Sequence, residues 1–341
     1  MEMTSVYVGL DYHKEFIQVC VVDESGRRLC NQRCGNDWRS VVAMGERYGK
    51  VIRAGIESCV GAANMADELV NQGGWCVDLA HPGYVRRMKQ NPDKSDFTDA
   101  QMLADLERVG YLPQVWLAPK EIQELRRLVR YRQQLVNERR SIKLRIGALL
   151  REHRIEKGPG RRWTKVWRLW LEAIPGMSES SQWILHRHLD RLKGLCAEIN
   201  AVEKRLLEWS KEDRIVEKLL ELPGVGLVTA WVLRAEIGRF DRFRSGKQLS
   251  RFCGLSPRNA SSGNRQADAG LIKAGNPLLR ATVIEAAHRL VRNFPRWREL
   301  GYKMEQAGKK KSVIAAAVGN RWMRWLFHQM TPAKEQPKGK E

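Results

Sequence analysis

The feature that most restricts the fold of this sequence is a change of periodicity near Pro119. Before this residue, short β-branched runs alternate with turn residues, and after it apolar residues recur every three or four positions from Ile122 to Leu149. The first pattern is typical of strands, and the second is typical of a long amphipathic helix. We therefore expect an α/β domain over residues 1–118, followed by all-α regions.

Residues 1–118 predict a hairpin-rich sheet that continues as a β-α-β unit. A turn at residues 23–27 separates two strand-like runs, and a helix is expected over residues 62–72. The expected strands cover residues 5–10, 16–22, 28–33, 51–56 and 75–80. This order favours a mixed sheet with helices on its faces.

The rest of the chain predicts two helical regions and a tail. A second apolar run over residues 184–206 matches the first, so residues 119–215 should form an antiparallel pair of helices, a coiled-coil region. Residues 216–330 should form a mainly helical domain that contains an exposed loop at residues 254–275. Its helices are expected over residues 228–237, 277–291 and 313–327, and residues 331–341 should be a flexible tail.

The chain carries a large positive charge. It has 60 Lys and Arg against 39 Asp and Glu, which leaves a net charge of +21. Residues 119–170 alone hold 16 of the basic residues and only five of the acidic ones. Such a surface concentrates polyanions, as nucleic-acid binding requires. The candidate contacts on the predicted helix are Arg126, Arg130, Arg139 and Lys143.

Several other classes of protein are excluded. No segment approaches the ~18 uninterrupted apolar residues of a membrane span, so we expect a soluble cytoplasmic protein with no membrane partner. The seven cysteines are scattered and never spaced as CxxC, which argues against a disulfide framework and against a zinc site. The twelve tryptophans are interpreted as packing anchors rather than as platforms for bases.

Four carboxylates are the candidates for catalysis. Asp11 and Glu57 end two predicted strands, and Asp96 and Asp99 share one face of a helix. Together they would form an oxygen-rich site for Mg²⁺, with Mn²⁺ as a substitute, as in an RNase H-like layout. The alternative is that they only start turns and charge the first turn of a helix. His13 is interpreted as a turn residue rather than as a ligand.

A polar loop over residues 254–265 contains a second candidate centre. Arg258 and Arg265 flank Ser261 and Ser262, and a serine that attacks phosphate needs cationic stabilisation of the phosphoryl oxygens. The alternative is a phosphate-contacting loop that has no nucleophile.

A glycine-rich turn precedes this loop. Gly224 and Gly226 lie in the segment LPGVG, directly before a predicted helix. Such a turn resembles the hairpin of helix-hairpin-helix modules, in which backbone N–H groups hold a phosphate. The alternative is a simple break between helices.

The motifs together resemble a known family. GLDYHKE, GIES, KSDFTDAQMLADL, LPGVG, FCGLSPRNASSG and IKAGNPLLR follow one another from Tyr7 to about Trp325. They are similar to the DEDD-type transposases of insertion sequences of the IS110 type. The sequence departs from the family in having Cys59 where a Thr-Gly pair is common after the Glu57 motif.

The resemblance implies a RuvC-like, RNase H-like N-terminal domain that holds Mg²⁺ on Asp11, Glu57, Asp96 and Asp99. It also implies a helical coiled-coil middle and a C-terminal transposase domain in which Ser262 is the nucleophile and Ser261 its neighbour. Lys273, in the motif IKAGNPLLR, is a further candidate for nucleic-acid contact.

The same resemblance implies a prokaryotic recombinase that acts on donor and target DNA of its element, guided by a non-coding RNA, and that forms a covalent phosphoserine intermediate. We expect a homodimer or homotetramer, in which the serine and the acidic residues meet within one chain or across subunits. Two alternatives are a structure-specific RNase H-like nuclease of the junction-resolvase type without serine chemistry and a non-catalytic architectural binder.

Overall fold

The computed structural model describes residues 4–88, 95–155, 158–259, 268–272 and 275–331. The chain divides into two compact units, residues 1–118 and residues 119–341, and each is described by itself. The tail predicted at residues 331–341 lies outside the described residues from position 332 onward.

Unit 1 is built on a six-stranded mixed sheet in the order β3-β2-β1-β4-β5-β6. Strand β1 is antiparallel to β2 and parallel to β4, as the sequence predicts for hairpins followed by a β-α-β unit. The strands are β1 (Ser5–Tyr12), β2 (Phe16–Asp23), β3 (Arg28–Gly35), β4 (Lys50–Glu57), β5 (Val77–Ala80) and β6 (Gln114–Val115). The edge strand β6 was not predicted, because two residues carry no periodic pattern.

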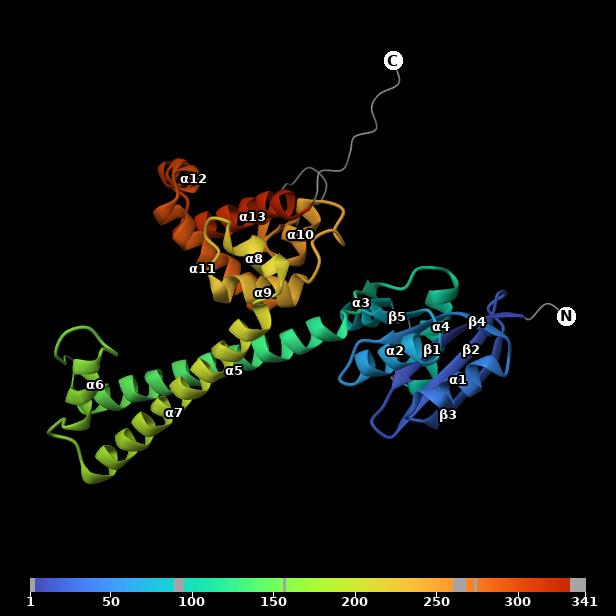
Figure 1. The fold of residues 1–341 in the computed structure, drawn as a ribbon, viewed down its shortest axis with the longest axis horizontal. Coiled ribbons are helices and arrows are strands. Elements are labelled where there is room, and N and C mark those ends of the chain that lie inside the picture. The colour runs from blue at the N-terminus through green and yellow to red at the C-terminus, as the bar shows by residue number, and fades with distance from the viewer. Residues whose placement is uncertain (1–3, 89–94, 156–157, 260–267, 273–274, 332–341) are drawn as a thin grey trace, which may run out of the picture. The chain divides into compact units, whose positions relative to one another are not determined.

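Helices cover both faces of this sheet (Figure 1). One face packs against α1 (Trp38–Glu46) and α2 (Ala62–Asn71), through alternate β1 residues such as Val8 and Leu10. The other face packs against α4 (Asp96–Arg108), and α3 (Pro82–Met88) precedes it in the chain. Helices α1 and α3 were missed, because each is too short to show a clear helical period.

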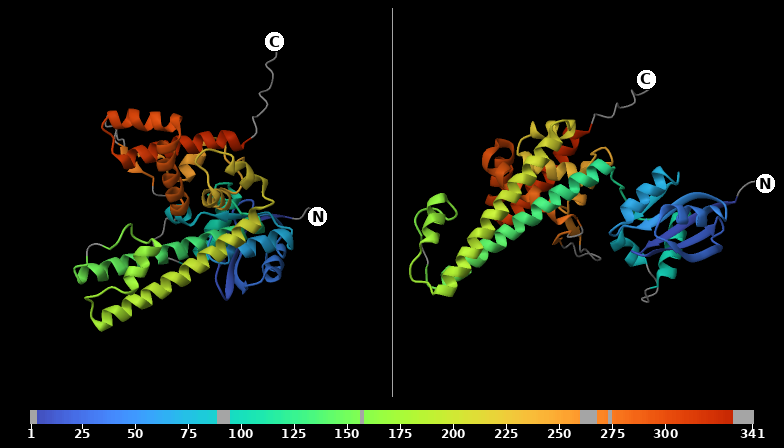
Figure 2. Two further views of the ribbon diagram at one scale, coloured as in Figure 1. Left: turned by 60° about the vertical axis from the view of Figure 1, so that its left-hand side comes forward. Right: turned by 60° about the horizontal axis from the view of Figure 1, so that its bottom comes forward.

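Unit 2 begins with two long helices, α5 (Lys120–Glu152) and α7 (Glu179–Ser210), which lie side by side as the two periodic runs predict (Figures 1 and 2). The short helix α6 (Lys165–Glu172) packs against them through Trp167 and Leu171. The Trp163 ring lies 4.6 Å from the Trp167 ring, centroid to centroid, so these tryptophans are packing anchors as expected.

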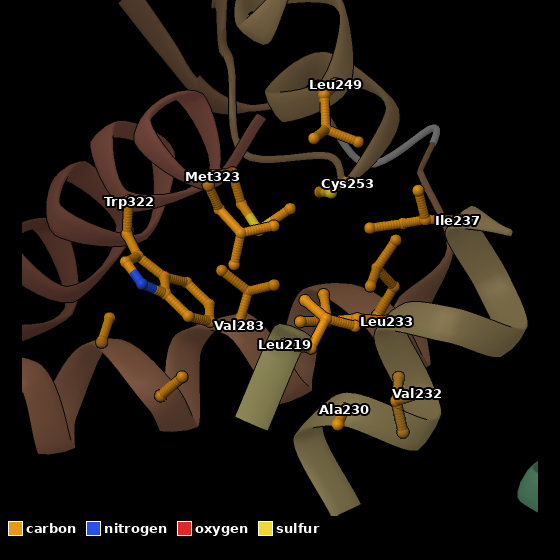
Figure 3. Packing of buried hydrophobic residues seen from close by; sticks show 14 of the residues in the cluster. Leu219, Ala230, Val232, Leu233, Ile237, Leu249, Cys253, Val283, Trp322 and Met323 are labelled. Carbon is orange, nitrogen blue, oxygen red and sulfur yellow. The ribbon is translucent and has the colours of Figure 1, made fainter. Parts of the chain in front are cut away.

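Six further helices lie in the described part of unit 2. They are α8 (Arg214–Leu220), α9 (Leu227–Ile237), α10 (Gly246–Phe252), α11 (Pro277–Asn293), α12 (Pro295–Gln306) and α13 (Lys311–Met330). Their core surrounds the fully buried Trp322, with Leu233 and Val283 among the side chains shown in Figure 3. Leu125 of α5 and Leu206 of α7 belong to the same core, so the long helices are anchored in it.

The predicted loop over residues 254–275 contains regular structure. Strands β7 (Pro257–Asn259) and β8 (Asp268–Leu271) pair antiparallel. The expectation of a loop over this whole range was therefore wrong near its two ends, where backbone pairing outweighs the low strand propensity of Pro257, Asn259, Asp268 and Gly270. Among the helices that the structure describes, none combines the length and the apolar character needed to cross a membrane.

Candidate functional site

The site in unit 1 depends on two paired glycines under helix α4. Gly9 of β1 pairs with Gly55 of β4, and a Cβ atom on Gly9 would lie 1.9 Å from the carbonyl oxygen of Ala100 in α4. A Cβ atom on Gly55 would lie 2.9 Å from Cγ of Glu107 in the same helix. The helix can approach the sheet this closely only because both positions lack a side chain.

This packing determines where four carboxylates lie. Side chains alternate between the faces of a strand, so Asp11 and Glu57, each two residues beyond a glycine, belong to the face that α4 covers. Asp96 and Asp99 form the first turn of α4. Two strand ends and one helix start thus deliver the four predicted acidic residues to one region of the sheet.

The electrostatics of Asp11 show that these charges interact. Burial raises the pKa of the Asp11 carboxyl above its ordinary value, His13 lowers it, and the charges of Asp99 and Asp96 raise it. Burial also raises the pKa of the Cys59 thiol, and the charges of Glu57 and Asp11 raise it further. Glu57 and Asp11 therefore act on a common neighbour, as expected for carboxylates at adjacent strand ends.

His13 lies in the turn between β1 and β2, as expected, and its side chain also contacts two of the carboxylates. Its Nε2 atom lies 3.2 Å from Oδ2 of Asp11 and 3.3 Å from Oδ1 of Asp96. The guanidinium of Arg33 contacts the second oxygen of Asp96 at 3.1 Å. Arg33 was not predicted from the sequence. The position of His13, two residues after Asp11, was a signal that both side chains could lie on the same side of the sheet.

The donor set of this site fits a divalent cation. One ligand atom each of Asp11, His13 and Asp96 lies within 4.8 Å of the others. Carboxylate oxygens are the preferred ligands of Mg²⁺ and Mn²⁺, and imidazole nitrogen is a ligand of transition-metal ions. Asp96 and Asp99 do start a helix, as the alternative interpretation had it, but the contacts of Asp96 with His13 and Arg33 extend beyond that role.

Unit 2 contains a cleft of about 1490 Å³ between α5, α9 and α11. Its walls carry three arginines, Arg130, Arg140 and Arg289, and three glutamates, so the charges of these side chains balance and the cleft is not strongly basic. Amide side chains such as Gln133 and Asn137 complete the α5 wall.

A buried carboxylate lies at the base of this cleft. Glu236 is only 3% exposed and accepts hydrogen bonds from Nε and Nη2 of Arg130 at 2.9 and 2.8 Å. It also accepts one from Nδ2 of Asn276 at 2.7 Å, and the same asparagine caps α11. Glu236 was not predicted from the sequence, where it is one of two charged residues, with Arg234, near the end of the mainly apolar helix α9.

The first turn of α9 is open toward the cleft. Gly226 is the exposed N-cap of this helix, without a side-chain cap, and a Cβ atom there would have no heavy atom within 4 Å. Gly224 has a φ of 84°, and a Cβ atom on it would lie 2.6 Å from Cδ2 of Leu290. The turn therefore uses Gly224 for its geometry and leaves Gly226 accessible to an anion.

The predicted basic contacts on α5 do not form one surface. Nε of Arg126 donates to the carbonyl oxygen of Ala235 at 2.6 Å, which gives it a structural role at the end of α9. Arg130 reaches the cleft, but Arg139 lies nine positions further on, which at about 100° per residue is the opposite side of the helix. Lys143 shares that side and lies 4.9 Å from the centroid of the Trp163 ring.

The predicted serine centre is described only in part. Arg258 is exposed on β7, whereas Ser261, Ser262, Arg265 and Lys273 lie outside the described residues.

The mixed sheet and its acidic residues are compatible with an RNase H-like DEDD domain, a class of enzyme that acts on phosphodiesters. Residues 8–155 match a family described as a transposase of the DEDD type, and residues 216–303 match the transposase IS116/IS110/IS902 family. The chain belongs to this family of insertion-sequence transposases, enzymes that cut and rejoin DNA.

Named relatives agree with this assignment. The chain is 26% identical over 327 residues to the transposase for insertion sequence element IS1111A of Coxiella burnetii (strain RSA 493 / Nine Mile phase I), which covers 94% of this chain and 88% of the relative. It is 29% identical over 238 residues, 68% of this chain and 69% of the relative, to the transposase for IS1328 of Yersinia enterocolitica. A probable family 20 transposase of Pseudomonas aeruginosa is 27% identical over 94% of this chain and 95% of its own length.

Proposed function

We propose that this transposase uses Asp11, Glu57, Asp96 and Asp99 as a Mg²⁺-binding tetrad and Ser262 as a nucleophile. In this proposal it exchanges strands between donor and target DNA under the guidance of a non-coding RNA. The observation that carries the metal site is the contact of Asp11 and Asp96 with one histidine, although they come from a strand end and a helix start far apart in the chain.

The acidic side chains would hold the cation and orient the scissile phosphate. Burial is the main cause of the raised pKa of Asp11, and the charges of Asp99 and Asp96 add to it. A bound cation would favour the ionised form of all these carboxylates. A bound divalent cation would neutralise developing charge on the phosphoryl oxygens and on the leaving oxygen.

Ser262 would make the exchange reversible. Its hydroxyl oxygen attacks phosphorus, a P–O bond of the DNA breaks, and the displaced strand leaves as a hydroxyl. The phosphoserine ester conserves the bond energy, so a hydroxyl of a second strand can displace the serine and rejoin the DNA. Arg258, exposed on the neighbouring strand β7, supplies a cation for the phosphoryl oxygens.

Two variants test the metal site. Asp11→Asn should abolish recombination and weaken Mg²⁺ binding while nucleic-acid binding stays near wild type, because it removes one ligand and leaves the basic surfaces intact. Asp23→Asn is the control, since Asp23 pairs with Val6 at the other end of β1. Equal Mg²⁺ affinity of the wild type and an Asp11/Asp99 double variant would refute the proposal.

Ser262→Ala separates the recombinase from the alternative nuclease. A recombinase loses the covalent protein–DNA adduct and strand exchange together, and Ser261→Ala keeps both. A structure-specific nuclease of the junction-resolvase type retains strand cleavage in both variants. An adduct that persists in Ser262→Ala would assign the nucleophile to another residue.

The open first turn of α9 is our candidate for a phosphate contact. Gly226→Asp would keep a good N-cap and yet place a negative charge where a phosphate should bind. We expect weaker RNA and DNA binding for Gly226→Asp and unchanged binding for Gly226→Ser, with both variants folded. Equal affinities of the two variants would exclude this contact.

Guidance by RNA and self-association complete the proposal. RNA that co-purifies with the chain, identified by sequencing, should include one transcript that pairs with donor and target DNA, and its absence would refute guidance.

A homodimer or homotetramer is supported by exposed apolar side chains on α6 and α7, namely Val166 (63% exposed), Leu169 (55%) and Trp183 (65%). Sedimentation of the full chain as a monomer would contradict it.

A further inference from the structure

His13 has the geometry of a ligand in the acidic site. Its Nε2 atom is 3.2 Å from an oxygen of Asp11 and 3.3 Å from an oxygen of Asp96. Two ligand atoms on adjacent vertices of an octahedron lie about 3 Å apart when each metal–ligand bond is about 2.1 Å. The imidazole nitrogen is thus at the correct spacing to bind the same cation as either carboxylate.

The ring is held in this place by the hairpin between β1 and β2. Its face stacks on Phe16, with ring centroids 4.6 Å apart, and the backbone N–H of His13 donates to the carbonyl oxygen of Phe16 at 3.0 Å. Nδ2 of Asn36 donates to the carbonyl oxygen of His13 at 3.0 Å. The imidazole is therefore preorganised, and its 35% exposed side chain leaves a path for an ion to enter.

The surroundings of Asp96 direct one of its oxygens toward the histidine. Oδ2 of Asp96 contacts Arg33 at 3.1 Å, and the Arg33 guanidinium lies 4.2 Å from the Phe16 ring centroid, so histidine and arginine share one aromatic support. Oδ1 of Asp96 is the atom near Nε2 of His13. An arginine that pairs with one oxygen of a carboxylate in this way fixes the orientation of the other oxygen, which is the one available to a metal ion.

From this geometry we infer that His13 is a nitrogen ligand of the cation held by Asp11 and Asp96, and that it makes the site prefer Mn²⁺ over Mg²⁺. The inference rests on the proposed metal site and specifies its selectivity. Oxygen ligands serve Mg²⁺ and Mn²⁺ alike. Mg²⁺ is a hard cation that gains little from a nitrogen ligand, whereas Mn²⁺ is a first-row transition-metal ion and accepts an imidazole nitrogen.

The test uses the full-length chain with Mn²⁺ as the probe. Pulsed electron paramagnetic resonance of bound Mn²⁺ should show ¹⁴N modulation in the wild type, and His13→Gln should lose it. Titration should show that His13→Gln weakens Mn²⁺ binding about tenfold and leaves Mg²⁺ binding within about twofold. His328→Gln is the control, because His328 is an exposed residue of α13 in unit 2, whereas the acidic site lies in unit 1.

The outcomes of these measurements separately test the ligand role of His13, the preference for Mn²⁺ and the metal site itself. Bound Mn²⁺ without ¹⁴N modulation in the wild type would overturn the inference, even if His13→Gln failed to fold. Equal weakening of Mn²⁺ and Mg²⁺ binding by His13→Gln would overturn the selectivity. Mn²⁺ binding that Asp11→Asn leaves unchanged would instead overturn the metal site itself, and the inference with it.

Discussion

Replacing Glu107 by Gln should stabilise unit 1 at alkaline pH. Glu107 lies on α4, is 2% exposed, and has a buried Oε1 atom without a hydrogen-bond partner among the described residues. Burial raises its pKa from 4.5 to about 7, the charge of Asp78 raises it as well, and Arg53 lowers it. Helix α4, which carries Asp96 and Asp99, therefore packs on the sheet through Glu107, a side chain whose ionisation is disfavoured by burial.

The sign and size of the effect follow from this shift. The folded pKa is above the unfolded value, so folding takes up a proton between pH 4.5 and about pH 7, and stability rises as pH falls through that window. Each pKa unit corresponds to about 1.4 kcal/mol, so ionisation of this group lowers the free energy of unfolding by about 3 kcal/mol at pH 8 relative to acid. Glu107→Gln keeps the shape of the side chain and removes that loss.

The assay is urea unfolding with chelator at several pH values from 5 to 8, followed by hydrogen exchange of peptides from β1, β4 and α4. The difference between Glu107→Gln and the wild type should grow in favour of the variant as pH rises. Asp105→Asn is the control, because Asp105 is on the same helix with a 39% exposed side chain. A difference that stays constant over this range, or a variant that is less stable at pH 8, would refute the reasoning.

Three further predictions concern local packing. Gly9→Ala should destabilise unit 1 by about 1–3 kcal/mol and weaken Mn²⁺ binding, because its Cβ would lie 1.9 Å from the Ala100 carbonyl oxygen. Calorimetry that finds wild-type stability for this variant would contradict the proposed packing. Gly147→Ala on α5 should add about 0.5–1 kcal/mol to the free energy of unfolding and so raise the melting temperature, since nothing lies within 4 Å of the added Cβ. A lower melting temperature would contradict this prediction. Asn276→Ala should cost about 1–2 kcal/mol through loss of the α11 cap, while Asn276→Ser recovers part of it in the same unfolding measurement, and two equally destabilised variants would exclude the cap as the cause.

The sequence alone determined the features that depend on local period. The alternation of β1 and the three-to-four spacing of α5 and α7 were visible in the residues, and most predicted bounds differ from the observed ones by one or a few positions. The acidic residues could be proposed as candidates for the same reason, because strand ends and an i, i+3 pair are properties of the chain itself. Elements that are too short for their apolar pattern to repeat clearly, such as β6 and α3, could not be found in this way.

Only the tertiary structure decided which side chains meet. Gly9 and Gly55 are each ordinary glycines in the sequence, and their role under α4 exists only because the parallel register of β1 and β4 places them side by side. His13 contacts Asp96 because a hairpin turn and a helix start converge, and Glu236 meets Arg130 because α5 packs on α9. Such contacts depend on register and on packing between distant segments, and neither is encoded in the period of any single segment.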